Sequence, residues 1–305
     1  MEVVDKIRES VSAISDLTEM GLLDQAEQLC RNSVGEWGRH TDLVRLQELI
    51  DAKQLAKERR ADNGSKYCPV CGESFKDFLP LPEYYVQNML RHRFKHIGRG
   101  EMTSIDEYSC PSCGASDRER LYGAWIKHES TSRRITGVEK LVHFAPEPAL
   151  SKMIRSMNIF GEYNTADMNM PGVDCHVDIT ALPFEDGSFD FFICSHVLEH
   201  IVHDRRALSE IFRITRQDGR GILMVPISLG IERSVEGTGN ESPEEQWRLF
   251  GQNDHVRLYA HDDFVSKIIE TGFHLTELGV NYFGKKVYES LGLRDTSILY
   301  VVEKW

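Results

Sequence analysis

Residues 177–227, VDITALPFEDGSFDFFICSHVLEHIVHDRRALSEIFRITRQDGRGILMVPI, constrain the fold of this 305-residue chain more than any other stretch. Residues 189–194 form a short, almost continuous apolar run, which is typical of a strand buried on both faces of a parallel sheet. Asp204 then offers a helix N-cap, and apolar residues recur at helical spacing until Asp218-Gly219 closes the helix. Residues 221–227 resemble a second buried strand. This β-α-β unit predicts an α/β fold, and the loop after its first strand is a typical ligand-binding position.

The flanking segments extend this unit into a doubly wound sheet. We expect strands at 140–144, at 160–165 leading to Asp167, and at 173–178, with a helix starting at Pro148. A helix at 262–270 and strands at 273–279 and 298–303 complete the domain. Residues 228–255 are mostly polar and show no strong pattern, which is typical of a lid or a substrate loop.

The run LPFEDGSFDFFICSHVLEHI resembles the central segment of class I S-adenosylmethionine-dependent methyltransferases of the type 11 kind. The resemblance covers roughly residues 138–305. It implies a Rossmann-like sheet with helices on both faces, in which the last two strands form an antiparallel edge. It also implies methyl transfer from S-adenosyl-L-methionine, with S-adenosyl-L-homocysteine as the product.

The turn after the first strand of this domain, LVHFAPEPAL, departs from the family pattern. His143 stands where the family has an acidic residue, and Ala145, Glu147 and Ala149 stand where glycines are usual. Without glycine the turn cannot easily adopt a positive φ. A carboxylate at position 147 would be stabilised by the helix N-terminus and could bind the α-amino group of the cofactor. Loss of cofactor binding is the alternative, but similar H-F-A-P-E turns in other methyltransferase-like sequences favour a variant site.

The resemblance also implies roles for residues at the ends of the other strands. Asp167 would accept hydrogen bonds from both ribose hydroxyls, or else cap a turn. Met168 would lie against adenine, the pair Asp178-Ile179 would meet the adenine edge, and Ser195 and His196 would border the sulfonium. The expected cofactor-binding residues are therefore Phe144, Ala145, Glu147, Asp167, Met168, Asp178, Ile179, Ser195 and His196.

Methyl transfer is an in-line displacement that requires alignment and, for a hydroxyl acceptor, removal of a proton. Candidate catalytic residues lie where the strands end. We expect His255 to act as a general base and Arg257 to anchor an acidic substrate, with His200 as a further candidate. Each histidine has a structural alternative, because a buried helix histidine needs no catalytic role. His261-Asp262-Asp263 reads more simply as a helix N-cap box.

Four of the seven cysteines stand in two matching knuckles, Cys68-Pro-Val-Cys71-Gly and Cys110-Pro-Ser-Cys113-Gly. Two knuckles supply four thiolates for a tetrahedral ion, and zinc is its usual occupant. The alternative is two unrelated pairs of free thiols. Because four thiolates leave no open coordination position, we expect a structural zinc site in a small ribbon.

Between the knuckles, residues 91–99 concentrate basic side chains beside aromatic ones. This segment could bind phosphate, RNA or an acidic sugar, or it could be the solvated face of a helix. The formal net charge of −12 argues against nucleic acid as the main partner. We therefore expect O-methylation of a small molecule, a glycan or a natural-product precursor. An RNA methyltransferase and a non-catalytic methyltransferase-like scaffold are the alternatives.

The remaining predictions concern organisation. Residues 1–63 are predicted to form helices, 64–130 a zinc ribbon and 131–305 the α/β domain. The helices would pack against the rest of the chain or mediate a homo-oligomer or a protein partner. Met1–Ser10 lacks the apolar core of a signal peptide, and no run is long enough to span a bilayer. We expect a cytoplasmic protein.

Overall fold

The computed structural model of the chain describes residues 66–132 and 134–305, and a few positions nearer the N-terminus (7, 10–12, 14, 30–34 and 43). Among these few, Ile14, Cys30 and Leu43 are buried together in a small apolar cluster. Most of the predicted N-terminal helical region lies outside the described residues, so that prediction stays untested.

The elements follow one another as a ribbon, a helical connection and an alternating α/β domain. The ribbon and its connection comprise β1 (Lys66–Tyr67), β2 (Ser74–Phe75), α4 (Glu83–Arg91) and α5 (Asp117–Thr131). The α/β domain comprises β3 (Lys140–Phe144), α6 (Pro148–Met157), β4 (Glu162–Asp167), β5 (Cys175–His176), β6 (Phe189–Ser195), the 3₁₀ turn η1 (Leu198–His200), α7 (Asp204–Ile214), β7 (Thr215–Met224), β8 (Val235–Glu236), α8 (Pro243–Phe250), β9 (Arg257–Leu258), α9 (His261–Thr271), β10 (His274–Leu278), α10 (Val280–Phe283), α11 (Lys285–Leu291) and β11 (Leu299–Glu303).

Seven strands form the central sheet in the order β10-β11-β7-β6-β3-β4-β5. The pairs from β7 to β5 are parallel, whereas β11 runs antiparallel to both β7 and β10. The parallel part has the order of a doubly wound sheet, with the antiparallel strand inserted beside its fifth strand. This is the class I methyltransferase arrangement, and it confirms the predicted fold class and the antiparallel edge.

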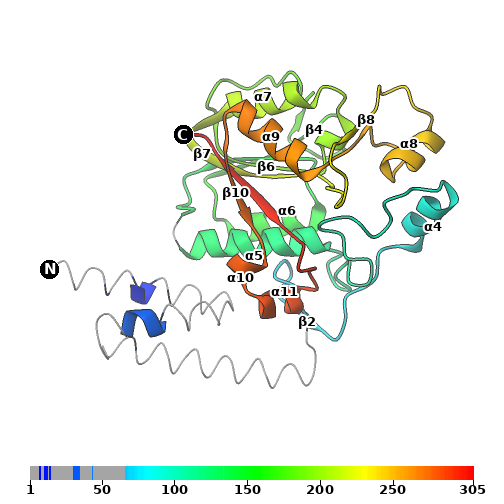
Figure 1. Cartoon of the computed structure of the whole chain (residues 1–305). Helices are drawn as coiled ribbons and strands as arrows, with labels where there is room; N and C mark the ends of the chain where they lie inside the picture. Colours follow the sequence, from blue (N-terminus) through cyan, green and yellow to red (C-terminus); the bar gives the residue numbers. More distant parts are fainter. Residues whose placement is uncertain are drawn as a thin grey trace.

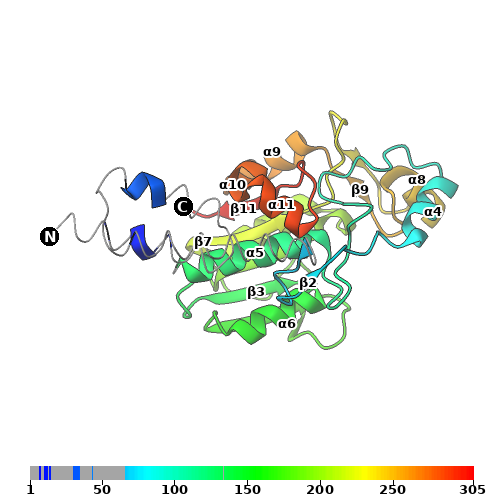
Figure 2. The ribbon, with the colours of Figure 1, turned by 90° about the horizontal axis from the view of Figure 1, so that it is seen from below.

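Helices cover both faces of the sheet. In Figure 1, α5 and α6 lie below the sheet and α7 and α9 lie above it, and Figure 2 shows α5 and α6 against the near face. Neighbouring residues of β6 explain this layering, because successive side chains of a strand point to opposite faces. The ring of Phe191 packs 5.9 Å from that of Trp125 on α5, while the ring of Phe192 packs 5.8 Å from that of Phe273, before β10.

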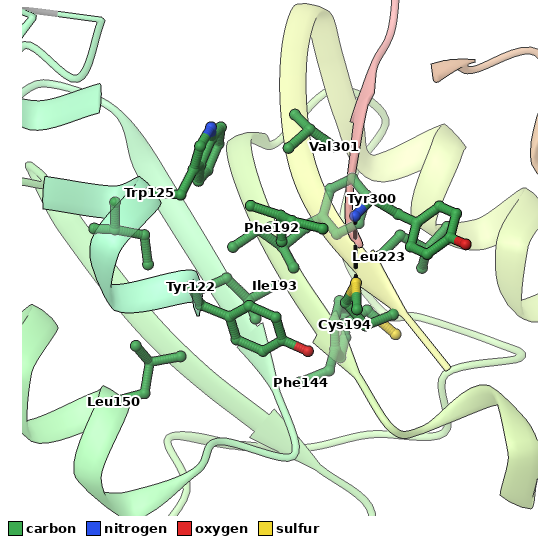
Figure 3. Packing of buried hydrophobic residues seen from close by; sticks show 14 of the residues in the cluster. Tyr122, Trp125, Phe144, Leu150, Phe192, Ile193, Cys194, Leu223, Tyr300 and Val301 are labelled. Carbon is green, nitrogen blue, oxygen red and sulfur yellow. Dashed lines mark hydrogen bonds between the residues drawn. The ribbon is translucent and has the colours of Figure 1, made fainter. Parts of the chain in front are cut away.

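The core is continuous from the ribbon to the last strand. Figure 3 shows Tyr122 and Trp125 of α5 and Leu150 of α6 directed toward the central strands. Cys68 and Val70 of the first knuckle belong to the same buried cluster as the sheet residues. The predicted boundary at 130/131 stays a prediction, but the two sides of it share one apolar core.

Arg120 of α5 joins the ribbon to the C-terminal helices. It is fully buried, and its guanidinium donates hydrogen bonds to the carbonyls of Glu107, Tyr108, Ala115 and Leu291. It also lies 3.7 Å from the centre of the Phe78 ring. A buried charge with all these acceptors is satisfied, so Arg120 fixes the position of the ribbon on α5.

Several predicted boundaries were wrong. Asp204 is the first residue of α7 rather than its N-cap, because its carboxylate accepts hydrogen bonds from Lys267 and Tyr259 instead. The helix ends at Ile214 and β7 begins at once, so Asp218-Gly219 lies within a strand. Similarly, α9 begins after Ala260, and His261 pairs with Asp262 and Glu277 rather than capping the helix.

The structure also shows the conformation of two segments that the sequence left open, residues 228–255 and 91–99. The polar stretch 228–255 contains α8, which opens with a capping box between Ser242 and Glu245. Trp247 of α8 packs against Tyr84 and His92, so α4 and α8 lie side by side, as both views show. The basic side chains of 91–99 mostly follow the end of α4 at Arg91, and they are therefore in a loop rather than on a helix face.

Across the part of the chain that the structure describes, every helix is too short or too polar to cross a membrane.

Candidate functional site

The strand order reverses between the paired strands β3 and β6. The connection after β3 leads toward one edge of the sheet, and the connection after β6 leads toward the other. In open α/β sheets this switch point is where ligands bind. Ala145 follows β3 with φ 47°, and His196 follows β6 with φ 56°. These are two of five non-glycine residues with a positive φ in the described chain. Strain of this kind often gathers at functional sites, and the turn adopts its left-handed conformation without glycine.

Arg118 and Glu147 form a buried, incompletely satisfied ion pair at this switch point. The Nε of Arg118 lies 3.8 Å from Oε1 of Glu147, and both atoms are buried without a hydrogen-bond partner. The other oxygen of Glu147 accepts a hydrogen bond of 2.9 Å from Nε2 of His143. Although burial would raise the pKa of Glu147, the hydrogen bond and charge of His143 and the charge of Arg118 lower it to about 2. The switch point thus brings one positive and one negative side chain together.

His143 takes the position where the family has an acid, and the structure shows how the substitution is accommodated. The His143 ring is fully buried between Tyr163, 2.8 Å from Nδ1, and Glu147. In this chain a carboxylate stands four residues after His143 instead, on Glu147 at the N-cap of α6. This arrangement fits the predicted role of Glu147 toward an α-amino group.

The expected ribose and adenine residues lie at the ends of β4 and after β5. Oδ1 of Asp167 accepts hydrogen bonds of 2.7 Å from the backbone of Asn169 and Met170. Oδ1 of Asp178 accepts hydrogen bonds from Thr180 in the same manner. Both carboxylates thus stabilise turns. Met168 is exposed beside Asp167, whereas Ile179 is buried.

Two further expected residues are buried on the other side of the switch point. Phe144 lies in the core at the end of β3, with only 2% of its surface exposed. Ser195 ends β6, and its hydroxyl lies 3.1 Å from that of Tyr122 on α5. This contact ties α5 to the end of β6, next to His196. Whether these residues contact a cofactor stays a prediction.

Glu199, His200 and His255, which we term the histidine cluster, meet just beyond the end of β6. One ligand atom of each residue lies within 4.8 Å of the others. The rings of His200 and His255 are 4.8 Å apart and nearly perpendicular. Glu199 is fully buried and His255 is 3% exposed, while the His200 side chain keeps 35% of its surface. The structure thus brings together the two histidines that the sequence singled out.

The protonation states within the histidine cluster follow from burial and charge. Burial lowers the pKa of His255 to about 4, against the opposing charge of Glu199. Burial would raise the pKa of Glu199, but the nearby imidazoles of His196, His255 and His200 lower it to about 2. At neutral pH the cluster therefore holds an ionised carboxylate beside a neutral imidazole.

Arg257 contributes to the loop that carries the cluster. It is 2% exposed, and its guanidinium donates to Glu236 and to the carbonyls of Leu198, Ile201 and Val202. Donors engaged in this way are not free for a ligand. These contacts favour a structural role for Arg257 over the predicted role of substrate anchor.

A polar cavity of about 960 Å³ lies beside this loop, between the start of α7, β8 and α9. Its lining includes Arg205, Arg206, Arg233 and Lys267 together with acidic residues, and it reaches Arg257. It contains none of the residues expected to bind the cofactor. The expected cofactor residues and this cavity are therefore separate parts of the domain.

The four predicted metal ligands, Cys68, Cys71, Cys110 and Cys113, meet in one site that we term the cysteine cluster. The Sγ atoms of Cys68 and Cys113 are 3.7 Å apart, and those of Cys71 and Cys110 are 3.8 Å apart. A tetrahedral zinc ion with bonds of ~2.3 Å requires sulfurs about 3.8 Å apart, whereas a disulfide requires ~2.05 Å. The geometry therefore fits zinc.

Each knuckle closes through a glycine with positive φ. Gly72 and Gly114 adopt φ 79° and 77°, and each donates its N–H to the carbonyl of the first cysteine of its knuckle. These two bonds close the tight turn of each knuckle, from which both of its thiols reach the cysteine cluster.

Sequence reasoning missed two residues of the site. Arg118 reads as one charge in the run DRER of a surface helix, and Glu199 reads as part of the family phrase V-L-E-H. No signal in the sequence marks Arg118, because it lies far along the chain from every expected cofactor residue. Only the fold brings it close to Glu147. For Glu199 the signal was the family phrase itself.

A family profile described as a methyltransferase domain matches residues 151–223. An uncharacterized methyltransferase of Mycolicibacterium gilvum is 43% identical over 51 residues, or 17% of this chain. The match spans 20% of that relative's length.

Solved structures with a similar fold include two methyltransferases that depend on S-adenosylmethionine. One, from Archaeoglobus fulgidus, has 9% identity and a TM-score of 0.41, covering 62% of this chain and 95% of its own. The other, from Mesorhizobium loti, has 14% identity and a TM-score of 0.38, covering 56% and 93%. The strand order and the profile match together support a methyltransferase domain of class I in this chain.

Proposed function

We propose that this protein is an S-adenosylmethionine-dependent methyltransferase. The observation that carries the proposal is the unsatisfied Arg118–Glu147 pair at the switch point of a class I sheet. A buried donor and a buried acceptor without partners are costly unless a ligand completes them. The methionine end of the cofactor offers a carboxylate for Arg118 and an ammonium group for Glu147.

The other cofactor contacts follow the strand ends. Asp167 would hold the ribose hydroxyls with the part of its carboxylate that the turn does not use, and Asp178 and Ile179 would meet adenine. When bound, the cofactor supplies an electrophilic methyl group on a sulfonium. The protein's task is then to align the acceptor and to accept its proton.

The acceptor would lie beyond β6, next to His196 and the histidine cluster. An ionised Glu199 beside a neutral His255 can accept or relay a proton from a hydroxyl group. The net charge of −12 favours a small molecule, a sugar or a natural-product precursor over nucleic acid. In the cysteine cluster, zinc would act structurally, because four thiolates complete its coordination.

Calorimetric titration of the zinc-loaded full chain with S-adenosylmethionine and S-adenosylhomocysteine tests the proposal. Saturable binding of both is expected. In Arg118→Met the affinity should fall roughly 10- to 100-fold, the cost of losing a hydrogen bond to a charged group. Asp167→Ala should weaken binding as well.

Arg155→Met is the matched control, because Arg155 lies on the exposed side of α6 and should leave the affinity unchanged. If the folded wild-type protein binds neither compound, the methyltransferase proposal is wrong. A methyltransferase-like scaffold that has lost its cofactor would then be the better explanation.

RNA is the second candidate substrate, and one observation favours it. Arg91, Arg93, Lys95 and Arg99 are exposed in and after the last turn of α4. Binding of a single-stranded RNA that weakens steeply with salt and is reduced by charge removal at these positions would favour RNA over a small molecule.

A further inference from the structure

Glu199 has an environment that the protein alone does not satisfy. It is fully buried, and neither of its carboxylate oxygens has a hydrogen-bond partner. Nδ1 of His196 approaches Oε1 to 3.1 Å, close enough for an ion-pair contact but without hydrogen-bond geometry. A carboxyl group withdrawn from water in this way requires a cationic or donating partner. A ligand atom of His200 and one of His255 lie within 4.8 Å of this carboxylate.

The two histidines are prepared as ligands. Nδ1 of His200 lies 3.0 Å from the carbonyl oxygen of Asp254, and since a carbonyl only accepts, this nitrogen carries the proton. The lone pair of His200 is therefore on Nε2. A metal-binding histidine typically donates its other N–H to a carbonyl in this way. Nδ1 of His255 is buried without any partner.

The backbone holds the two chain segments of the cluster together. The N–H of Val256 donates a hydrogen bond of 2.8 Å to the carbonyl of Glu199. Arg257 adds hydrogen bonds to the carbonyls of Leu198 and Ile201, on either side of the Glu199–His200 pair. Ligands from η1 and from the segment before β9 are thus fixed relative to each other without a metal.

We propose that Glu199, His200 and His255 bind one divalent first-row transition-metal ion. One carboxylate and two imidazoles suit such ions, and three protein ligands leave coordination positions open. The inference rests on the proposed function for its role: the ion would bind the acceptor hydroxyl and lower its pKa. Glu199, His200 and His255 would then hold the ion instead of accepting the proton. The hydroxyl proton would pass to water as an O–C bond forms to the methyl group and the C–S bond breaks to release the thioether product.

Titration of the full chain, loaded with one equivalent of zinc and freed of excess metal by gel filtration, with Mn²⁺ tests the site, by calorimetry and by the loss of the free Mn²⁺ signal in electron paramagnetic resonance. Thiolates select softer ions, so Mn²⁺ reports on the histidine cluster and not on the cysteine cluster. We expect one Mn²⁺ per chain and a rise in Tm on binding. Both should be lost in Glu199→Gln and in His200→Ala.

His274→Ala is the control, because His274 is an exposed histidine at the start of β10, stacked on Trp305. It should bind Mn²⁺ like the wild type. His200 is partly exposed, so its variant should fold even if the buried Glu199→Gln does not. The absence of Mn²⁺ binding, or equal binding in His200→Ala, overturns the proposal.

The same samples separate this inference from the proposed function. S-adenosylmethionine binding without Mn²⁺ binding would overturn the metal site and keep the methyltransferase. Mn²⁺ binding without S-adenosylmethionine binding would support the metal site and overturn the role given to it.

Discussion

Among the residues that the structure describes, two clusters have the composition of metal sites, one of cysteines and one of histidines with Glu199. They are built in different ways. Each knuckle of the cysteine cluster is a local turn with its own glycine, and its thiols belong to the apolar core. The histidine cluster joins Glu199 and His200 to a residue from a distant segment, at the end of the central strands. We propose that the first arrangement supports the fold and that the second serves the chemistry.

This difference predicts which property a substitution in each cluster should reduce. Residues that belong to the core should affect stability, whereas residues at the switch point should affect binding or turnover. Four substitutions test this division, ordered by the expected effect.

Cys110→Ser should have the largest effect. Cys110 is 1% exposed and belongs to the core shared with the sheet. Its loss removes one zinc ligand and leaves a hydroxyl in an apolar environment, which should lower the free energy of unfolding by several kcal/mol, on the order of 5. Urea unfolding and zinc content measure this. Cys175→Ser, outside the cluster, should change neither, and a Cys110→Ser protein with wild-type stability would contradict the structural role.

His200→Ala should affect turnover instead. Removing a group that accepts a proton or holds an activating ion should lower kcat roughly 10²- to 10⁴-fold. The Tm and the Kd for S-adenosylmethionine should stay near the wild-type values, because the side chain is partly exposed and lies outside the Arg118–Glu147 pair. Steady-state kinetics and thermal unfolding check both. Unfolding of this variant, or full activity, would contradict the expectation that the histidine cluster affects turnover rather than stability.

Glu101→Gln compares a second buried glutamate with Glu199. Burial raises the pKa of Glu101 to about 7, and the hydrogen bond from Tyr300 only partly opposes it. The folded state therefore binds more protons than the unfolded state between pH ~4.5 and ~7. The free energy of unfolding should fall as pH rises through this window, by up to roughly 3 kcal/mol.

In Glu101→Gln this dependence should be smaller, as measured by urea unfolding at pH 5 and pH 8. Asp117, whose pKa burial raises to about 6, contributes to the slope in both proteins and cancels in the difference. Identical slopes would show that Glu101 is not the group responsible.

Ala145→Gly should have the smallest effect. Alanine at φ 47° carries strain of ~1–2 kcal/mol, and the additional backbone entropy of glycine removes ~0.5–1 of the gain. We expect a net increase of about 0.5–1 kcal/mol in the free energy of unfolding, measured by urea titration. A decrease would indicate that the side chain of Ala145 contributes to packing at the switch point.

Much of the fold followed from local patterns. The first strand of the α/β domain and the helix after Pro148 appear as predicted, because apolar runs and turn residues specify them locally. The antiparallel edge appears as the family resemblance implied. Predicted helix boundaries were wrong where the expected capping side chain makes tertiary hydrogen bonds. The carboxylate of Asp204, for example, accepts hydrogen bonds from Lys267 and Tyr259. The helix within the polar stretch 228–255 was missed, because its short apolar face becomes evident only against α4.

By itself, the sequence determined the class of sheet and singled out the four cysteines and the two histidines that the structure brings together, from the spacing of the knuckles and from the residues that follow the strands. Only the tertiary structure decided that Arg118 faces Glu147, that Arg257 supports a loop, and that Glu199 is buried beside both histidines. The physical reason is that burial and charge pairing depend on segments far apart in the chain, and local patterns do not encode which of these segments meet.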